Sequence, residues 1–131
     1  MKRKLISSGT IWEKKFGYSR AVQVGDRVMV AGTTAVDENG HVIGKGSPGE
    51  QARFIYEKIA RALREAGASL DDVVRVRTYV TDIKRWEDVA AVQGEVFEKA
   101  RPAATLVECS ALVNPDLLVE IEVDAIISGS S

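Results

Sequence analysis

A strict alternation of apolar and acidic residues near the C-terminus limits what this chain can fold into more than any other feature does. Residues 119–125 read Val-Glu-Ile-Glu-Val-Asp-Ala, so apolar and acidic side chains take turns along the segment. Successive side chains of a β-strand point to opposite faces of a sheet, and the pattern therefore predicts a strand with one apolar and one charged face. We expect helices to cover the apolar face.

Two further segments are expected to continue these faces. In residues 73–80, one side carries Val74, Val76, Thr78 and Val80, and the other carries Val73, Arg75, Arg77 and Tyr79. In residues 104–112, one side carries Thr105, Val107, Cys109 and Ala111, and the other carries Ala104, Leu106, Glu108 and Ser110. If the apolar sides of these strands face the helices, five charged residues lie together on the other face of the sheet, namely Arg75, Arg77, Glu108, Glu120 and Glu122. That face is either solvated or covered by other copies of the chain.

Helix signals occur in two segments between the expected strands. The first segment opens with a capping box at residues 47–50, Ser-Pro-Gly-Glu, continues with apolar residues at helical spacing, and stops at Gly67. The second helix is expected from Lys84 to Lys99, before Arg101-Pro102 ends it, with buried residues that include Trp86, Val89, Val96 and Phe97.

The complete element order predicts one α/β (α+β) domain spanning residues 1–131. Strands are expected at residues 5–7, 18–24, 27–31 with an extension at 33–36, 73–80, 104–112 and 118–127, while 9–17 is interpreted as irregular. The order is β-β-β-α-β-α-β-β, which predicts a single mixed sheet with two helices on one face. Residues 128–131 are interpreted as a disordered tail.

Composition excludes several classes of partner. The chain has 131 residues, and 18 basic residues nearly balance 19 acidic ones to leave a net charge of −1. We therefore expect no attraction to nucleic acid or to an anionic membrane surface. No apolar run approaches the roughly 18 residues of a membrane span, and the first apolar stretch is too short for a signal peptide. The single cysteine, Cys109, excludes an internal disulfide and favours a cytoplasmic location.

Motifs for metal or nucleophilic chemistry are missing from the sequence. The single histidine, His41, lies in a predicted hairpin turn, which leaves no multi-histidine metal site. Cys109 is interpreted as a small core residue rather than a nucleophile. Trp12 and Trp86 are interpreted as packing residues, because no basic stripe accompanies them as it would in a nucleic-acid surface.

An ordered set of short segments resembles the Rid family (reactive intermediate deaminase, YjgF-type) over nearly the whole length. The matching segments are Gly17-Tyr18, 25–32, Gln51, 66–74, 79–82, 101–103 and 119–122. The resemblance implies a chorismate mutase-like fold and a homotrimer, in which three sheets form a closed central barrel with helices outside. It also implies small-molecule clefts between subunits, which in this family hydrolyse reactive enamines and imines to keto acids and ammonia without a metal or organic cofactor.

The resemblance assigns site residues position by position. Tyr18 matches the pocket tyrosine, and Glu120 matches the glutamate that holds or activates the attacking water. The position of the arginine that binds the substrate carboxylate is Ala104 here, and Thr105 stands where a serine is usual. Two further polar positions have become apolar, namely a serine at Ala31 and a cysteine at Leu106.

Loss of that arginine leaves two questions open. A guanidinium clamps a carboxylate with two hydrogen bonds, and losing such a pair in a partly buried site costs about 1.5–3 kcal/mol. Arg77 is a candidate replacement cation near Glu120, whereas its structural alternative is an ion pair with Glu122 or Glu108. The protein is therefore either an enamine/imine deaminase with altered substrate choice or a non-catalytic small-molecule-binding or regulatory trimer. Ribonuclease activity is disfavoured by the near-neutral charge and the single histidine.

Overall fold

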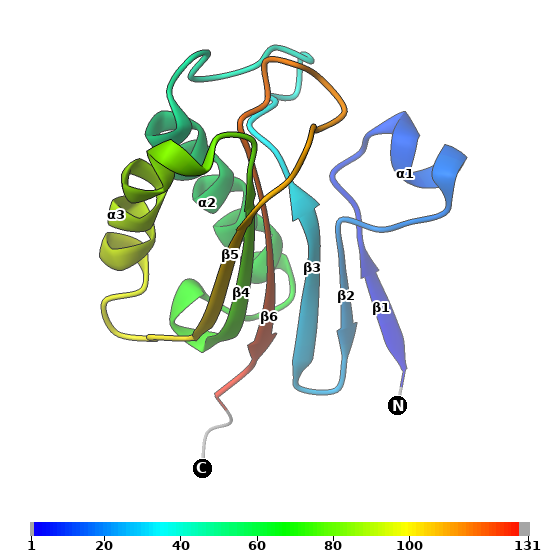
Figure 1. Ribbon diagram of the computed structural model, residues 1–131. Coiled ribbons are helices and arrows are strands. Elements are labelled where there is room, and N and C mark those ends of the chain that lie inside the picture. The colour runs from blue at the N-terminus through cyan, green and yellow to red at the C-terminus, as the bar shows by residue number, and fades with distance from the viewer. Residues whose placement is uncertain (1, 129–131) are drawn as a thin grey trace.

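The computed structural model describes residues 2–128, which build one six-stranded sheet with two long helices on one side (Figure 1). The strands lie in the order β1-β2-β3-β6-β4-β5, and only β4 and β5 pair in parallel among the described residues. The predicted single mixed sheet is confirmed. The strand bounds are β1 (Arg3–Ile6), β2 (Ala21–Val24), β3 (Arg27–Thr33), β4 (Val73–Val80), β5 (Ala103–Glu108) and β6 (Val119–Ile126).

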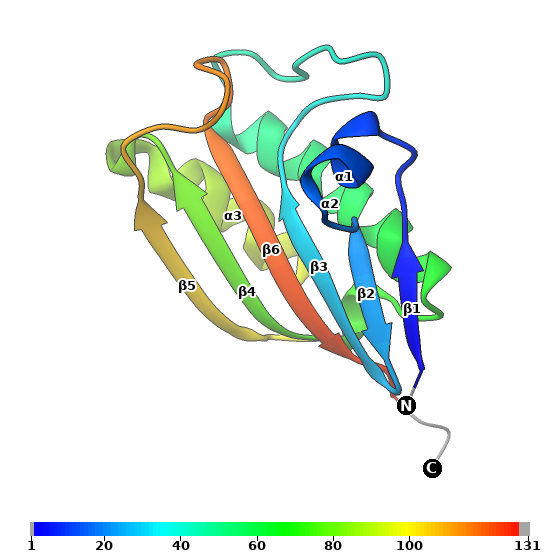
Figure 2. The same ribbon diagram turned by 90° about the vertical axis from the view of Figure 1, so that its right-hand side faces the viewer.

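The two long helices are α2 (Pro48–Glu65) and α3 (Trp86–Val96), and both cover the same sheet face. The predicted cap begins α2, because the Ser47 hydroxyl accepts a hydrogen bond of 3.2 Å from the Glu50 amide. A short helix, α1 (Ile11–Phe16), lies on the opposite side of the sheet (Figure 2). Two 3₁₀ turns, Leu70–Asp72 and Ile83–Arg85, lead into β4 and α3.

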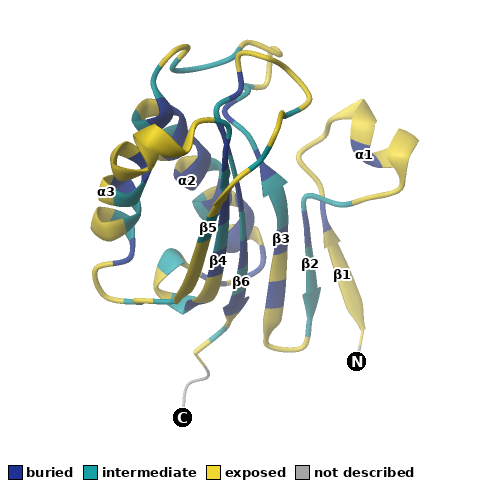
Figure 3. Ribbon diagram, in the orientation of Figure 1, coloured by how far each residue is buried: buried dark blue, intermediate teal, exposed yellow. Residues whose placement is uncertain are grey.

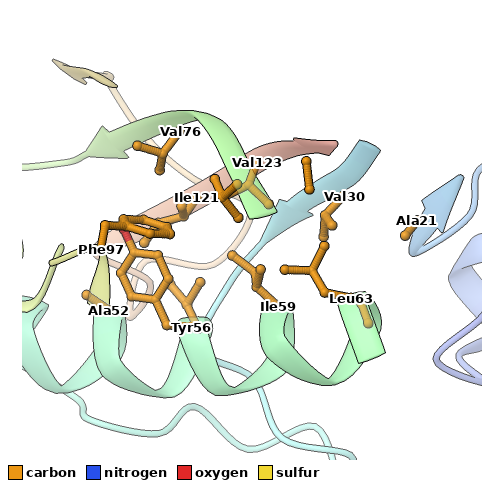
Figure 4. Packing of buried hydrophobic residues seen from close by; sticks show 14 of the residues in the cluster. Ala21, Val30, Ala52, Tyr56, Ile59, Leu63, Val76, Phe97, Ile121 and Val123 are labelled. Carbon is orange, nitrogen blue, oxygen red and sulfur yellow. The ribbon is translucent and has the colours of Figure 1, made fainter. Parts of the chain in front are cut away.

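The core fills the space between the sheet and the two long helices (Figures 3 and 4). The Ile55, Ile59 and Leu63 side chains of α2 are completely buried against strand residues. Burial of an aliphatic side chain of this size contributes about 1.5–3 kcal/mol, so this helix face stabilises the fold strongly. The alternation of residues 119–125 is confirmed, because its apolar members are all buried and its acidic members are half-buried.

Three expectations about local structure were wrong. Residues 11–16 form α1 rather than an irregular segment. Trp86 keeps 46% of its surface exposed, because it begins α3 and lies outside the buried stripe. Val73 is buried while Val74 is exposed, since the register of β4 against β6 shifts between Val73 and Arg75. Such an irregularity reverses the side-chain alternation on one side of it.

The expected orientation of β5 was also wrong. Thr105 pairs with Arg77 and therefore lies on the open face, which is the sheet face away from α2 and α3. Leu106 pairs with the buried Thr78 and packs against the helix-covered core. Glu108 points to the helix side, where its carboxylate accepts a 3.0 Å hydrogen bond from the Ile83 amide.

Several smaller predictions can also be placed in the structure. His41 is exposed in its turn, where the Asp37 amide donates to the His41 carbonyl at 2.9 Å. Cys109 is half-buried rather than part of the core cluster. Ser128, expected in the tail, donates hydrogen bonds to Asp72, and residues 129–131 lie outside the described part. Across residues 2–128, no helix is long and apolar enough to span a membrane, and no group of acidic, cysteine or histidine residues has a metal-binding arrangement.

Candidate functional site

A β-bulge in β3 creates the candidate site on the open face. Val30 pairs with Val123 and Thr33 pairs with Ile121, so two residues of β3, Ala31 and Gly32, stand opposite one residue of β6. Bulges of this kind bend a strand and redirect its neighbours, and they are frequent beside active sites. Here the bulge places Gly32, which has no side chain, next to the acidic face of β6.

The Glu120 side chain lies directly over Gly32. A β-carbon built on Gly32 would come within 2.0 Å of the Glu120 carboxylate oxygen Oε2, so only glycine permits this approach. Burial raises the pKa of Glu120, the positive charge of Arg20 opposes that change, and the negative charge of Glu122 adds to it. The result is a half-buried carboxylate that holds a proton more readily than an exposed glutamate does.

Arg20 lies across the bulge from Glu120 and was missed by the sequence analysis. The Ala31 amide donates to the Arg20 carbonyl at 2.9 Å, which places Arg20 opposite the bulge, just before β2. Its Nη2 donates a 2.7 Å hydrogen bond to the Gly32 carbonyl. Burial lowers the pKa of this guanidinium, while the charges of Tyr18, Glu13 and Glu120 act in the opposite direction.

Tyr18 reaches the same region from the end of α1. Gly17 adopts a left-handed conformation with φ 71°, which ends α1 and turns the chain toward β2. The Tyr18 amide donates to the Glu13 carbonyl at 2.9 Å, and the Tyr18 side chain is exposed. Glu13 itself is buried; burial acts to raise its pKa, but hydrogen bonds from Ser8 and neighbouring hydroxyls outweigh this and lower it.

Within one chain, Arg77 is paired with carboxylates other than that of Glu120. Its Nη1 lies 3.4 Å from a Glu122 carboxylate oxygen and 3.6 Å from one of Asp124. The Tyr79 hydroxyl donates a 2.7 Å hydrogen bond to the other oxygen of Glu122. Arg77 therefore forms the structural ion pair that was its alternative interpretation, and Arg20 is the positive charge that acts on Glu120.

The remaining predicted site residues lie on β5, at the far edge of the sheet. β4 separates β5 from β6, so Ala104, Thr105 and Leu106 do not meet Glu120 within one chain. Thr105 shares the open face with Glu120, whereas Ala104 and Leu106 pair with residues of the helix-covered face. One chain thus joins Arg20, the bulge and Glu120, with Tyr18 close enough to act on the charge of Arg20, and leaves the β5 residues apart.

Comparison with known proteins identifies the family. The sequence model described as Endoribonuclease L-PSP matches residues 13–127, which contain all of the site residues above. The chain belongs to the YjgF/Rid family. The crystal structure of Rv2704 from Mycobacterium tuberculosis, a member of the YjgF/YER057c/UK114 family, superposes on this Rid protein with a TM-score of 0.88. The two are 47% identical, over 96% of this chain and 100% of that one.

Two further relatives agree with this assignment. The RutC family protein PYRAB12510 of Pyrococcus abyssi is 41% identical over 80% of this Rid protein and 82% of its own length. The crystal structure of YyfB from Yersinia pestis, described as a member of the conserved Rid protein family, is 34% identical with a TM-score of 0.72. That match covers 97% of this chain and 100% of YyfB. The expected chorismate mutase-like fold is therefore confirmed.

Proposed function

We propose that this Rid protein hydrolyses reactive enamines or imines to a carbonyl compound and ammonia, with a substrate choice that differs from that of relatives carrying the family arginine. The observation that carries the proposal is the Glu120 carboxylate, which lies over Gly32 with a pKa raised by burial. A carboxylate of raised pKa is suited to take a proton from water near neutral pH.

The chemistry needs only water and a short series of proton transfers. A water molecule held by Glu120 adds to the carbon of the C=N bond while the carboxylate accepts one of its protons. Glu120 passes that proton to the nitrogen, which gives a carbinolamine. The hydroxyl proton is then transferred to the same nitrogen as the C–N bond breaks and the C=O bond forms, so imine and water become carbonyl compound and ammonia; an enamine first becomes the imine by moving a proton from nitrogen to carbon. The exposed Tyr18 hydroxyl is available to donate a hydrogen bond to the reacting group.

We also propose that the open face is covered by two further copies in a homotrimer. Exposed apolar side chains lie on that face among the charged ones, namely Leu5, Met29, Val107 and Ile126. A neighbouring copy would bring the edge of its own β5, where Thr105 lies on the open face, toward Glu120, which one chain cannot do. The ligand site would then lie between subunits. A cytoplasmic location belongs to the same proposal.

A non-catalytic binding or regulatory trimer is the second candidate. It is favoured by the apolar residues Ala31, Ala104 and Leu106, which stand where the family resemblance places polar ones. Such a site would still hold a small ligand while contributing less to the transition state. The ribonuclease in the description of the family model is not proposed, because the net charge is −1 and the single histidine lies in an exposed turn.

Ammonia release distinguishes the two candidates. Imines with different side chains, with and without a carboxylate, would be generated freshly beside the protein. We expect wild-type protein to accelerate release, Glu120→Gln to lose at least about 100-fold, and Tyr18→Phe to lose about tenfold. Glu98→Gln removes an exposed carboxylate after α3 and should leave the rate unchanged. No acceleration with any imine would leave the binding candidate and reject the deaminase.

A further inference from the structure

Two arginines are partly buried among the described residues, and they differ in their partners. Arg77 is held by the carboxylates of Glu122 and Asp124. Arg20 has no carboxylate oxygen within 4.0 Å anywhere in residues 2–128, although it is also largely enclosed. A charge that is removed from water without a partner is unfavourable, so the environment of Arg20 requires an explanation.

The hydrogen bonds of Arg20 are also incomplete. A guanidinium has five N–H groups, and Arg20 uses Nη2 to bind the Gly32 carbonyl. Its Nε is buried and has no hydrogen-bond acceptor in the described structure. A buried donor without an acceptor is unfavourable, and an anionic ligand with two oxygens would supply the missing acceptor.

Arg20 lies beside the reactive carboxylate of the proposed function. Arg20 and Glu120 both contact Gly32, one through the Gly32 carbonyl and the other over its α-carbon. Their opposite charges attract each other, yet they stay too far apart for an ion pair. A small molecule that touches Glu120 is therefore within reach of Arg20.

We propose that Arg20 is the anion-binding residue of this site and that it receives the carboxylate of a small 2-oxo or 2-imino acid from the β2 side of Glu120. The inference rests on the proposed function for the identity of the ligand. It changes one expectation drawn from the sequence. Ala104 in place of the family arginine implied weaker binding of a substrate carboxylate, and Arg20 offers a replacement for the lost guanidinium. In this protein the cation comes from the same chain as Glu120, just before β2 and across from the bulge.

Binding of a stable product analogue tests the inference without turnover. 2-Oxobutyrate and its uncharged amide, 2-oxobutanamide, would be titrated into the wild type, Arg20→Gln, Arg20→Lys and Arg61→Gln, with amide and arginine Nε resonances followed by NMR. Arg61→Gln removes an exposed positive charge on α2 and serves as the matched control. Thermal unfolding of each variant shows whether it remains folded.

We expect 2-oxobutyrate to shift the Gly32 amide and the Arg20 Nε resonances of the wild type. Arg20→Gln should raise the Kd of 2-oxobutyrate at least about tenfold, and Arg20→Lys should recover part of the loss because the charge returns without the planar fork. The affinity for the uncharged amide should change less than twofold, and Arg61→Gln should resemble wild type.

Equal 2-oxobutyrate affinity in folded Arg20→Gln and wild type would overturn the inference, as would a wild type that does not bind 2-oxobutyrate. A variant with lower unfolding temperature but unchanged affinity would assign Arg20 a structural role only, which also overturns it. The proposed deaminase is judged separately by ammonia release. A protein that binds 2-oxobutyrate through Arg20 without releasing ammonia would keep this inference and reject the enzyme.

Discussion

Replacing Gly32 by alanine should displace the Glu120 carboxylate without unfolding the protein. The new β-carbon would lie 2.0 Å from Oε2, whereas ordinary contact begins at 3.4 Å, so the oxygen must move by about 1.4 Å. Misplacement of a reacting group by about 1 Å can cost about 100-fold in rate. We therefore expect kcat/KM for ammonia release to fall about 100-fold in Gly32→Ala.

The fold should tolerate this substitution. The displaced atom is the free end of a flexible side chain, and the Gly32 backbone is not left-handed, so alanine meets no conformational strain there. Alanine in place of glycine at such a position stabilises by about 0.4–1 kcal/mol through the unfolded chain. Gly94→Ala in α3 is the matched control, because nothing lies within 4 Å of its new β-carbon. It should gain similar stability and keep the full rate.

The two measurements together decide the outcome. Thermal unfolding reports stability, and the rate of ammonia release reports the position of the carboxylate. If Gly32→Ala remains within twofold of wild type while Glu120→Gln loses its activity, the reasoning that the bulge fixes the carboxylate position is refuted. A lower unfolding temperature in Gly32→Ala than in Gly94→Ala would show that the cost falls on the fold instead.

Three further outcomes are expected. Burial raises the pKa of Glu120, so the wild type loses stability as pH rises from the ordinary pKa of 4.5 through the raised pKa. Glu120→Gln should therefore unfold at a higher temperature than the wild type at pH 7, but not at pH 4. Burial lowers the pKa of Lys58 to about 8, so the wild type should gain stability relative to Lys58→Met as pH rises from 8 to 10.5. Urea unfolding measures this, and a difference in unfolding free energy that does not change with pH would contradict it. Light scattering should give a trimer mass for wild type, and Met29→Asp on the open face should give a monomer; a wild-type monomer would contradict the proposed assembly.

Sequence patterns predicted those parts of the fold that depend on local chemistry. The Ser47 cap set the start of α2, and the alternation in residues 119–125 set the faces of β6. The orientation of β5 failed because both of its sides carry apolar residues, and the parallel register against β4 depends on the length of the α3 crossover. The alternation of side chains within β5 does not determine this register.

The site was predictable only in part for a related reason. Family resemblance pointed to Tyr18 and Glu120, but it could not place them relative to a cation. Arg20 became visible once β2 and β3 were paired, because its role depends on facing the bulge across the sheet. From the sequence, Arg77 was a candidate for the cation near Glu120, because both lie on the polar face of the sheet. Only the structure shows that Glu122 and Asp124 hold it. Ion-pair partners are chosen by register, which a single strand does not reveal.

The short helix α1 should open locally more easily than the rest of the fold. Glu13 is its only buried residue, while Ile11, Trp12 and Phe16 are exposed. Six residues are too few to hold a helix by themselves, so α1 depends on the hydrogen bonds around that one carboxylate. Local opening of α1 should therefore cost far less free energy than global unfolding. Because Tyr18 follows α1, one wall of the site can open and reclose on its own, and amide hydrogen exchange in residues 11–16 should be much faster than in β6.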